Sequence, residues 1–237
     1  MKPAVSVIIC TYNEAENLPY VLPRIPDWVD EILLVDGHST DGTVDIARQL
    51  TPRIRITYQD GKGKANALAW GFKHAAGDIL VTMDADGSDD PALLEKFIAP
   101  LLEGFDFVKG SRFPLGHIPR GVKFHRVVGN RFLASLVNLL LETNYTDVCS
   151  GYNAFWKSVV ARIPGLVENT AAAEPSMYIR IAKAGLRVTE VYHDDEGRIH
   201  GRSHEGKYSF IEHGFRTLRY ILKEAKTPLQ DQRGKVT

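Results

Sequence analysis

The sequence lacks the features that mark several large classes of protein. It has only two cysteines among 237 residues, Cys10 and Cys149, and neither stands in a CxxC or Cys/His spacing. This excludes a disulfide framework and a zinc site of the usual spacing, and it fits a reducing compartment. The 29 Lys and Arg residues balance the 29 Asp and Glu residues, so the composition favours neither a nucleic-acid-binding protein nor a disordered chain.

Long apolar runs and two common glycine motifs are also absent. No window reaches the roughly 18 apolar residues of a membrane span, and the N-terminus has no signal-peptide pattern. We therefore expect a cytoplasmic protein that is not integral to a membrane. There is no GxGxxG after the first apolar run, which argues against NAD or FAD, and no GxxxxGK[ST], which excludes a P-loop.

Apolar β-branched runs alternate with amphipathic segments along the first half of the chain. Strands are predicted at residues 5–10, 31–36, 54–58, 79–83 and 105–110. Helices are predicted after residue 14 and at residues 41–50, 64–75 and 91–102. This alternation is typical of βαβ units, so we expect an α/β fold with a mostly parallel sheet flanked by helices.

The second half is less regular. The predicted elements are a strongly apolar helix at residues 127–141, a short strand within 149–156, a helix at 175–184, a strand at 187–191 and an amphipathic helix at 208–225. We expect one domain over residues 1–226 and a disordered tail over residues 227–237.

One apolar strand runs directly into four carboxylates within seven residues, and Asp84 and Asp86 come first. Alternate residues of an extended chain point to the same side, so these two charges repel unless a cation relieves them. Hard divalent cations typically bind through one or two carboxylates, with substrate phosphates completing the shell. The pair therefore predicts a metal site for a bound diphosphate. A solvated turn that caps the following helix is the alternative.

Polar residues also follow the first two predicted strands. They form the segments Thr11-Tyr12-Asn13-Glu14 and Asp36-Gly37-His38-Ser39-Thr40-Asp41-Gly42-Thr43. Taken singly, Asn13 or Asp41 is more often a helix cap than a ligand. Doubly wound sheets bind ligands outside the carboxyl ends of their strands, so three such clusters together indicate a binding site. Asp36 could accept hydrogen bonds there from a ribose or a base.

A series of motifs extends from residue 5 to about residue 203. Besides the three strand-end segments, it comprises Gly61-Lys62-Gly63-Lys64, Gly110-Ser111-Arg112, Asp147, Ser150-Gly151-Tyr152 and Arg198-Ile199-His200-Gly201-Arg202-Ser203. In this order the motifs resemble the family 2 glycosyltransferases, and within them the polyprenyl-phosphate (dolichyl-phosphate mannose synthase-like) branch. The resemblance implies a GT-A fold, with a nucleotide-sugar-binding half at residues 1–110 and an acceptor-binding half at residues 111–226.

The resemblance also implies a donor and a cofactor. The donor would be a nucleotide diphosphate sugar, a GDP- or UDP-hexose, and Asp84 and Asp86 would bind Mg²⁺ or Mn²⁺. The residues expected around the donor are Thr11, Tyr12, Glu14, Asp36, Lys62, Asp84, Arg198, Arg202 and Ser203. Ser88 stands where the family frequently has Gln, and a hydroxyl is a weaker metal ligand than an amide carbonyl.

No acidic residue stands between Asp106 and Glu142, although this stretch holds six Lys and Arg residues. An apolar helix begins in the same stretch, and arginines beside an apolar helix suit a lipid phosphate. We therefore expect Arg112, Arg126 and Arg131 to bind a polyprenyl phosphate or another anionic acceptor. A solvated basic face and burial of the helix in the core are the alternatives.

The last predicted helix, at residues 208–225, also combines an apolar stripe with Lys and Arg residues around it. Such a helix can lie on an anionic membrane surface, which would place the protein peripherally at the inner face of the membrane. Ordinary docking of the helix against the domain is an equal alternative.

These expectations combine into a metal-dependent, inverting transfer of a hexose, either mannose or glucose. The residues expected to carry the chemistry are Asp86, Arg112, Arg126 and Glu174. A phosphate acceptor is already largely ionised at neutral pH and needs no strong base, whereas a sugar hydroxyl does. Glu174 is the candidate base, and a favourable charge at a helix start is its alternative reading. A sugar-hydroxyl acceptor and a non-catalytic nucleotide-sugar-binding protein stay open as alternatives.

Overall fold

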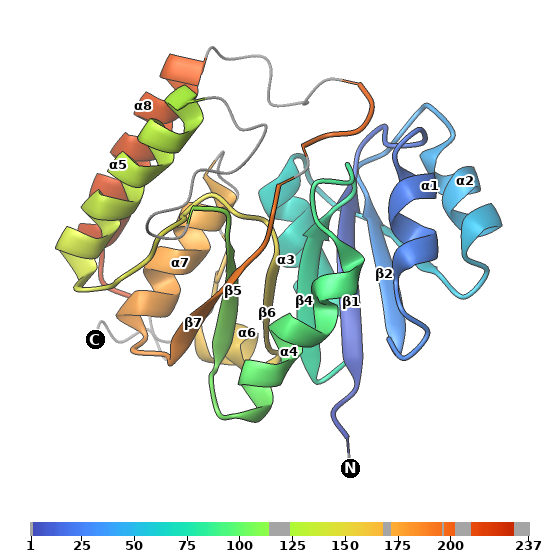
Figure 1. Ribbon diagram of the computed structural model, residues 1–237, viewed down its shortest axis with the longest axis horizontal. Coiled ribbons are helices and arrows are strands. Elements are labelled where there is room, and N and C mark those ends of the chain that lie inside the picture. Colours follow the sequence, from blue (N-terminus) through green and yellow to red (C-terminus); the bar gives the residue numbers. More distant parts are fainter. Residues whose placement is uncertain (1, 114–123, 168–171, 196, 202–209, 230–237) are drawn as a thin grey trace.

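A seven-stranded sheet forms the centre of the computed structural model, which describes residues 2–113, 124–167, 172–195, 197–201 and 210–229 (Figure 1). The strands, in sheet order, are β3 (Arg55–Tyr58), β2 (Glu31–Asp36), β1 (Val5–Thr11), β4 (Ile79–Asp84), β6 (Asn153–Trp156), β5 (Phe107–Ser111) and β7 (Val188–Tyr192). Strand β6 runs antiparallel to both of its neighbours, and the other pairs are parallel. The expected α/β fold with a mostly parallel sheet is confirmed.

Helices cover both faces of the sheet. They are α1 (Leu18–Val21), η1 (Leu22–Arg24), α2 (Thr43–Leu50), α3 (Lys64–His74), η2 (Pro91–Leu93), α4 (Leu94–Leu102), α5 (Phe124–Leu141), α6 (Ser158–Arg162), α7 (Ala173–Lys183) and α8 (Phe210–Lys226). Alternate residues of β1 point to opposite faces: Ile8 packs in the core with α3 and α7, whereas Val7 and Ile9 pack with α1 and α4. The sheet is therefore buried on both sides, as its apolar strands require.

The observed elements differ from the expected ones at a few boundaries. The helix expected from residue 91 begins as the short 3₁₀ turn η2, because Asp90 caps it by accepting a hydrogen bond from the Ala92 N–H. The helix expected after residue 14 is only four residues long, since Pro23 follows it closely within η1. The short helix α6 was not predicted. Residues 230–237, most of the expected tail, lie outside the described residues.

Candidate functional site

The three polar clusters meet at the carboxyl ends of β2, β1 and β4, which are neighbours in the sheet. Thr11 pairs in register with Asp36, and Cys10 pairs with Asp84. In Figure 1 these strand ends lie toward the top of the molecule, the end at which α5 and α8 begin. The structure therefore brings together the segments that the strand-end argument predicted.

Asp84 and Asp86 come close for a different reason from the one that the sequence suggested. Strand β4 ends at Asp84, so strand alternation does not continue to Asp86. Instead the chain turns at Gly87, whose φ of 87° is a left-handed conformation that favours glycine. Ser88 stabilises this turn by donating to Asp86 Oδ1 from its backbone N–H at 3.1 Å and from its hydroxyl at 2.6 Å. Ser88 thus orients Asp86.

Lys64 is a site residue that the sequence reasoning did not single out. Its Nζ lies 2.6 Å from Asp84 Oδ1 and 2.7 Å from Glu174 Oε1, so one ammonium joins the aspartate pair to the candidate base. A signal was available, because Lys64 is the first residue of α3, where the helix dipole disfavours a cation. A lysine at such a position needs compensating carboxylates nearby.

Burial and mutual repulsion set the ionisation of this cluster. Burial disfavours the charged form of Lys64, but the Asp84 and Glu174 carboxylates raise its pKa well above the ordinary value. Burial likewise opposes ionisation of Asp84, yet Lys64 holds its pKa below the ordinary value. For Asp86, burial and the charge of Asp84 both raise the pKa. Burial, followed by the charge of Asp84, also raises the pKa of Asp89 well above its ordinary value.

These carboxylates fit a divalent cation. The Asp86 carboxylate is half-buried and is repelled by the charge of Asp84, and Ser88 and Arg198 compensate for this only in part. An added cation would relieve the remaining repulsion. Oxygen donors of this kind are the ligands that Mg²⁺ and Mn²⁺ prefer. Within the described residues, no group of three or more His, Cys, Asp or Glu side chains is placed to hold a metal ion. The fit therefore concerns a pair of aspartates.

The segment around Arg198 crosses from the second half of the chain to the first. Its guanidinium donates to both carboxylate oxygens of the buried Glu14 at 2.7 Å and lies 3.6 Å from Asp86 Oδ2. The Ile199 N–H donates to the Asp86 carbonyl at 3.0 Å, and the His200 N–H donates to Asn17 at 2.8 Å. The structure therefore places Arg198 beside Asp86, and its contact with a donor stays a prediction. Arg202 and Ser203 lie outside the described residues.

Two carboxylates, those of Asp147 and Asp195, fix the side chain of Arg112. It donates from Nε to Asp147 Oδ2 at 2.7 Å and from a terminal nitrogen to Asp195 at 3.2 Å. Asp147 is fully buried, and although burial alone would raise its pKa, Arg112 lowers the pKa below its ordinary value. Arg126 and Arg131 are exposed on α5. The roles of these three arginines toward an acceptor stay predictions.

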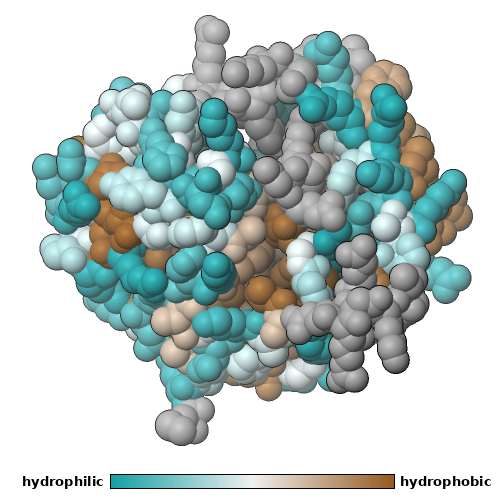
Figure 2. Space-filling view, turned by 180° about the vertical axis from the view of Figure 1, so that it is seen from behind, coloured by the Kyte–Doolittle hydropathy of each residue, from teal (hydrophilic) through white to brown (hydrophobic). Residues whose placement is uncertain are grey.

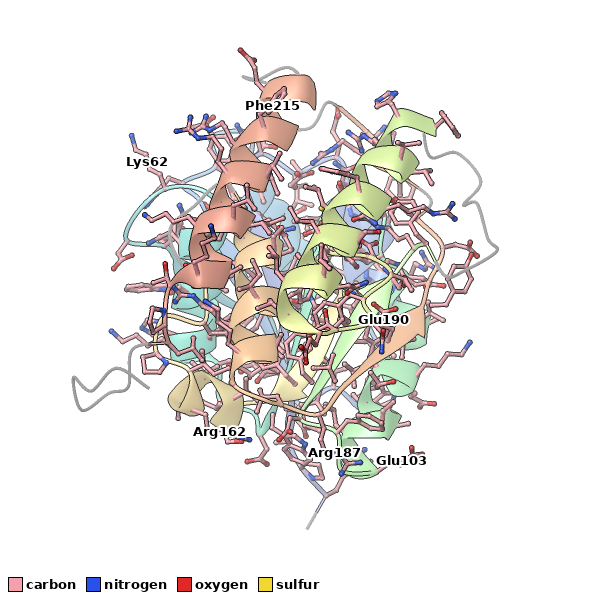
Figure 3. The ribbon with its side chains drawn as sticks, turned by 90° about the vertical axis from the view of Figure 1, so that its left-hand side faces the viewer. Lys62, Glu103, Arg162, Arg187, Glu190 and Phe215 are labelled. Atoms are coloured by element: carbon pink, nitrogen blue, oxygen red, sulfur yellow. The ribbon has the colours of Figure 1, made fainter. Side chains whose placement is uncertain are left out.

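The residues expected around the nucleotide lie in contrasting surroundings. Tyr12 is 49% exposed at the end of β1, and Lys62 is exposed ahead of α3, toward the same end of the molecule as Phe215 (Figure 3). Asp36 is fully buried and accepts hydrogen bonds from Thr11 and from the N–H and hydroxyl of Ser39. Asp36 therefore shapes the turn after β2, and its contact with a ribose or base stays a prediction.

Helix α5 places much of its apolar surface outside the core. Phe124, Val128, Phe132 and Leu139 fall on one stripe and are 50% to 80% exposed, whereas Val127 and Val137 are buried on the opposite side. On α8, Phe215 and Leu222 are also exposed. Figure 2, which views the molecule from behind, shows apolar surface along its right-hand edge, and this edge corresponds to the left-hand side of Figure 1, where these two helices lie. The face expected on α5 is therefore largely exposed, and burial in the core holds for the opposite side of the helix and for Leu136.

A mostly parallel sheet whose strand ends gather a carboxylate pair and several cations defines an α/β protein with a candidate ligand site at that edge. The chain belongs to the glycosyl transferase family 2, whose family model matches residues 6–163. The motifs that suggested this family therefore identified it correctly.

The chain is similar to named members of this family. It is 32% identical over 230 residues to the dolichol-phosphate mannosyltransferase of Pyrococcus furiosus, covering 91% of this chain and 64% of that protein. It is 32% identical over 203 residues to the undecaprenyl-phosphate mannosyltransferase of Micrococcus luteus, covering 79% and 81%. The chain spans 61% to 64% of the length of three curated relatives that it matches.

The fold also matches a solved structure. Glucosyl-3-phosphoglycerate synthase from Mycobacterium tuberculosis, crystallised with Mn²⁺, UDP-glucose and phosphoglyceric acid, superposes with a TM-score of 0.75. The match covers 98% of this chain and 82% of that chain at 20% identity, and it confirms the GT-A fold. Among the helices that the structure describes, none is long and apolar enough to cross a bilayer.

Proposed function

We propose that this chain transfers a hexose, mannose or glucose, from a GDP- or UDP-sugar to a polyprenyl phosphate with inversion at the anomeric carbon. The observation that carries the proposal is the half-buried Asp84 and Asp86 pair at the edge of the sheet where the two halves of the chain meet. Two relatives named as mannosyltransferases of dolichol phosphate and undecaprenyl phosphate support this choice of acceptor.

Asp84 and Asp86 would hold the divalent cation, Mg²⁺ or Mn²⁺. When bound, it would neutralise charge on the leaving nucleoside diphosphate. Arg198 lies beside Asp86 and would add a second positive charge toward the same diphosphate. Glu14 holds Arg198 in place through two hydrogen bonds of 2.7 Å.

The nucleotide would occupy the ends of β1 and β2. Tyr12 offers an exposed ring there, and Lys62 offers an exposed ammonium. Thr11 and Asp36 support the turn beneath, and Arg202 and Ser203 complete the expected donor set. The acceptor phosphate would lie on the opposite side, toward Arg112, Arg126 and Arg131.

A membrane surface is the proposed setting for the acceptor. Helix α8 packs against α5, and the apolar stripe of α5 stays exposed. Exposed basic residues accompany both helices: Arg126, Arg131, Arg216, Arg219, Lys223 and Lys226. Apolar side chains flanked by positive charge suit an anionic lipid surface, to which each Lys or Arg near the surface contributes about 1 kcal/mol. The protein would thus bind the membrane peripherally at its cytoplasmic face.

A sugar-hydroxyl acceptor is the second candidate, because Glu174 lies close to the aspartate pair. Its carboxylate shares Lys64 with Asp84 and is 14% exposed. A hydroxyl acceptor needs a base, and general-base catalysis contributes about 10²–10⁴-fold. Glu174→Gln should therefore lower turnover by at least about 10²-fold with a hydroxyl acceptor but only mildly with a phosphate acceptor.

A transfer assay tests the proposed function. Radiolabelled GDP-mannose, UDP-glucose or another common donor is mixed with Mn²⁺ and either polyprenyl phosphate or a free sugar. We expect a labelled lipid that forms only with polyprenyl phosphate, together with release of the nucleoside diphosphate. Failure to form lipid-linked sugar from any donor would contradict the proposal. Nucleotide-sugar binding without turnover would support the non-catalytic alternative.

A further inference from the structure

Lys64 links the two halves of the site through one ammonium group. Asp84 ends β4 in the first half of the chain, and Glu174 lies in the first turn of α7 in the second half. The Nζ of Lys64 lies 2.6 Å from the first carboxylate and 2.7 Å from the second. The Asp84 oxygen that pairs with this ammonium is one that a metal ion at the aspartate pair would also bind.

The backbone at Gly151 confines this ion pair. A Cβ at Gly151 would lie 2.9 Å from Lys64 Nζ and 3.0 Å from both carboxylate oxygens of Asp84, so the pair in this position would have to shift to admit a larger residue there. The Gly151 carbonyl is fixed in turn by a 2.7 Å hydrogen bond from the Thr82 hydroxyl on β4. The ammonium therefore lies between a fixed backbone and two carboxylates.

Helix α3 holds Lys64 at this place. Gly63 precedes the helix with a φ of 85°, and Ala65, Leu68 and Phe72 are buried against the sheet, so the first turn is fixed beside the strand ends. The helix dipole disfavours a cation at this position, and Asp84 and Glu174 compensate for it. Helix α3 therefore fixes the positive charge of Lys64 between Asp84 and Glu174.

We propose that Lys64 is a resident counter-ion of Asp84 that keeps a divalent cation off the aspartate pair until a nucleoside diphosphate arrives. An ammonium and a metal ion repel each other at contact distance, so the metal must displace Lys64 from Asp84. The negative charge of the diphosphate favours replacement of the ammonium by the metal ion at Asp84. The displaced ammonium of Lys64 stays paired with Glu174. The metal and the nucleotide would consequently bind together. This inference rests on the proposed function, because it requires the metal to bind at Asp84.

Calorimetric titration of Mn²⁺ without nucleotide tests this role without any measurement of activity. Removal of a unit charge in contact with Asp84 should tighten Mn²⁺ binding to Lys64→Met by about tenfold or more relative to wild type. Lys73→Met is the matched control, since it removes the same charge from an exposed side chain in the last turn of the same helix. We expect this control to change Mn²⁺ affinity by less than about threefold, because exposed charges are screened.

A second titration, with GDP or UDP present, completes the test. The nucleotide should increase Mn²⁺ affinity more for wild type than for Lys64→Met, because the variant has no ammonium to displace. Lys64→Gln, neutral but polar, serves as a second variant, and thermal melting verifies that each protein is folded.

Two results would overturn the inference in distinguishable ways. Equal Mn²⁺ affinity of wild type and both Lys64 variants without nucleotide, with binding intact when nucleotide is added, would refute the role of Lys64 alone. Absence of Mn²⁺ binding to all proteins even with nucleotide would refute the metal-dependent function on which the inference rests.

Discussion

Asp84 and Asp86 are alike in sequence but differ in what their carboxylates contact. Asp84 pairs with the Lys64 ammonium at 2.6 Å, whereas Asp86 accepts hydrogen bonds from Ser88 and has the Arg198 guanidinium only at 3.6 Å. Burial and the charge of Asp84 consequently raise the pKa of Asp86. Asp86 is therefore the carboxylate for which a bound cation gives the greater relief.

Replacing Asp86 tests this difference. Asp86→Asn removes one of the two charged metal ligands, so we expect transfer to fall by about 10²-fold or more, the size found when one group that stabilises transition-state charge is lost. Asp90→Asn is the control, because Asp90 lies four residues later and caps η2 while pairing with the exposed Arg24. Steady-state rates of both variants give the comparison, and similar rates would contradict a metal-binding role for Asp86.

Among the elements, the strand ends and the start of α3 were predictable from the sequence, but the contacts that Lys64 makes at that start were not. The run from Ile79 to Asp84 indicates a buried strand, and polar residues at its end indicate a site by the general rule for such sheets. Lys64, by contrast, offers one signal, a cation at a helix start, and this signal does not say which carboxylates compensate for it. Its two carboxylate partners lie 20 and 110 residues further along the chain, and only the folded topology brings them together.

An ion pair between Arg112 and Asp147 joins the end of β5 to the segment that precedes β6. Burial opposes ionisation of Asp147, but Arg112 holds its pKa below the ordinary value, so the unfolded chain binds its proton more readily than the native protein does. The stabilisation is therefore fully present above the unfolded pKa of about 3.9 and is lost as the pH falls through the native pKa.

Asp147→Asn should thus lower the free energy of unfolding at pH 7 by about 1–3 kcal/mol. It should also flatten the decrease in stability that wild type shows below about pH 4. Urea unfolding at a series of pH values measures both effects. Asp45→Asn, at an exposed position paired with Arg48, should leave the profile unchanged. An unaltered acid profile in Asp147→Asn would contradict the account.

At the scale of the whole molecule, the sequence could not decide which surfaces are buried. The apolar spacing in α5 predicts a helix equally well for a core or an interfacial position, and only the packing of α8 against α5 and α7 leaves the α5 stripe outside. The antiparallel placement of β6 between β4 and β5 likewise depends on long-range pairing. Local sequence patterns do not predict pairings between strands that lie far apart in the sequence.

The exposed stripe leads to a prediction about membranes. Replacing Phe132 and Leu139 together with Ser should weaken binding to vesicles rich in anionic lipid by about tenfold or more, because burial of each side chain contributes about 1.5–3 kcal/mol. Leu102→Ser is the control, since Leu102 is 59% exposed at the end of α4. Cosedimentation measures the binding. Wild-type binding that is equally strong to neutral vesicles, or unaffected by the double substitution, would contradict a basic apolar docking face.

The central claim is that the strand-end cluster binds a nucleoside diphosphate together with a divalent cation. The most direct measurement is the melting temperature of the full chain with GDP, UDP and their hexose conjugates, each with and without Mn²⁺. A ligand that binds only the native state must stabilise it, so one nucleotide family should raise the melting temperature in the presence of Mn²⁺. The increase should largely disappear in Asp86→Asn. A melting temperature that no nucleotide raises with Mn²⁺, or that rises equally in Asp86→Asn, would contradict the account.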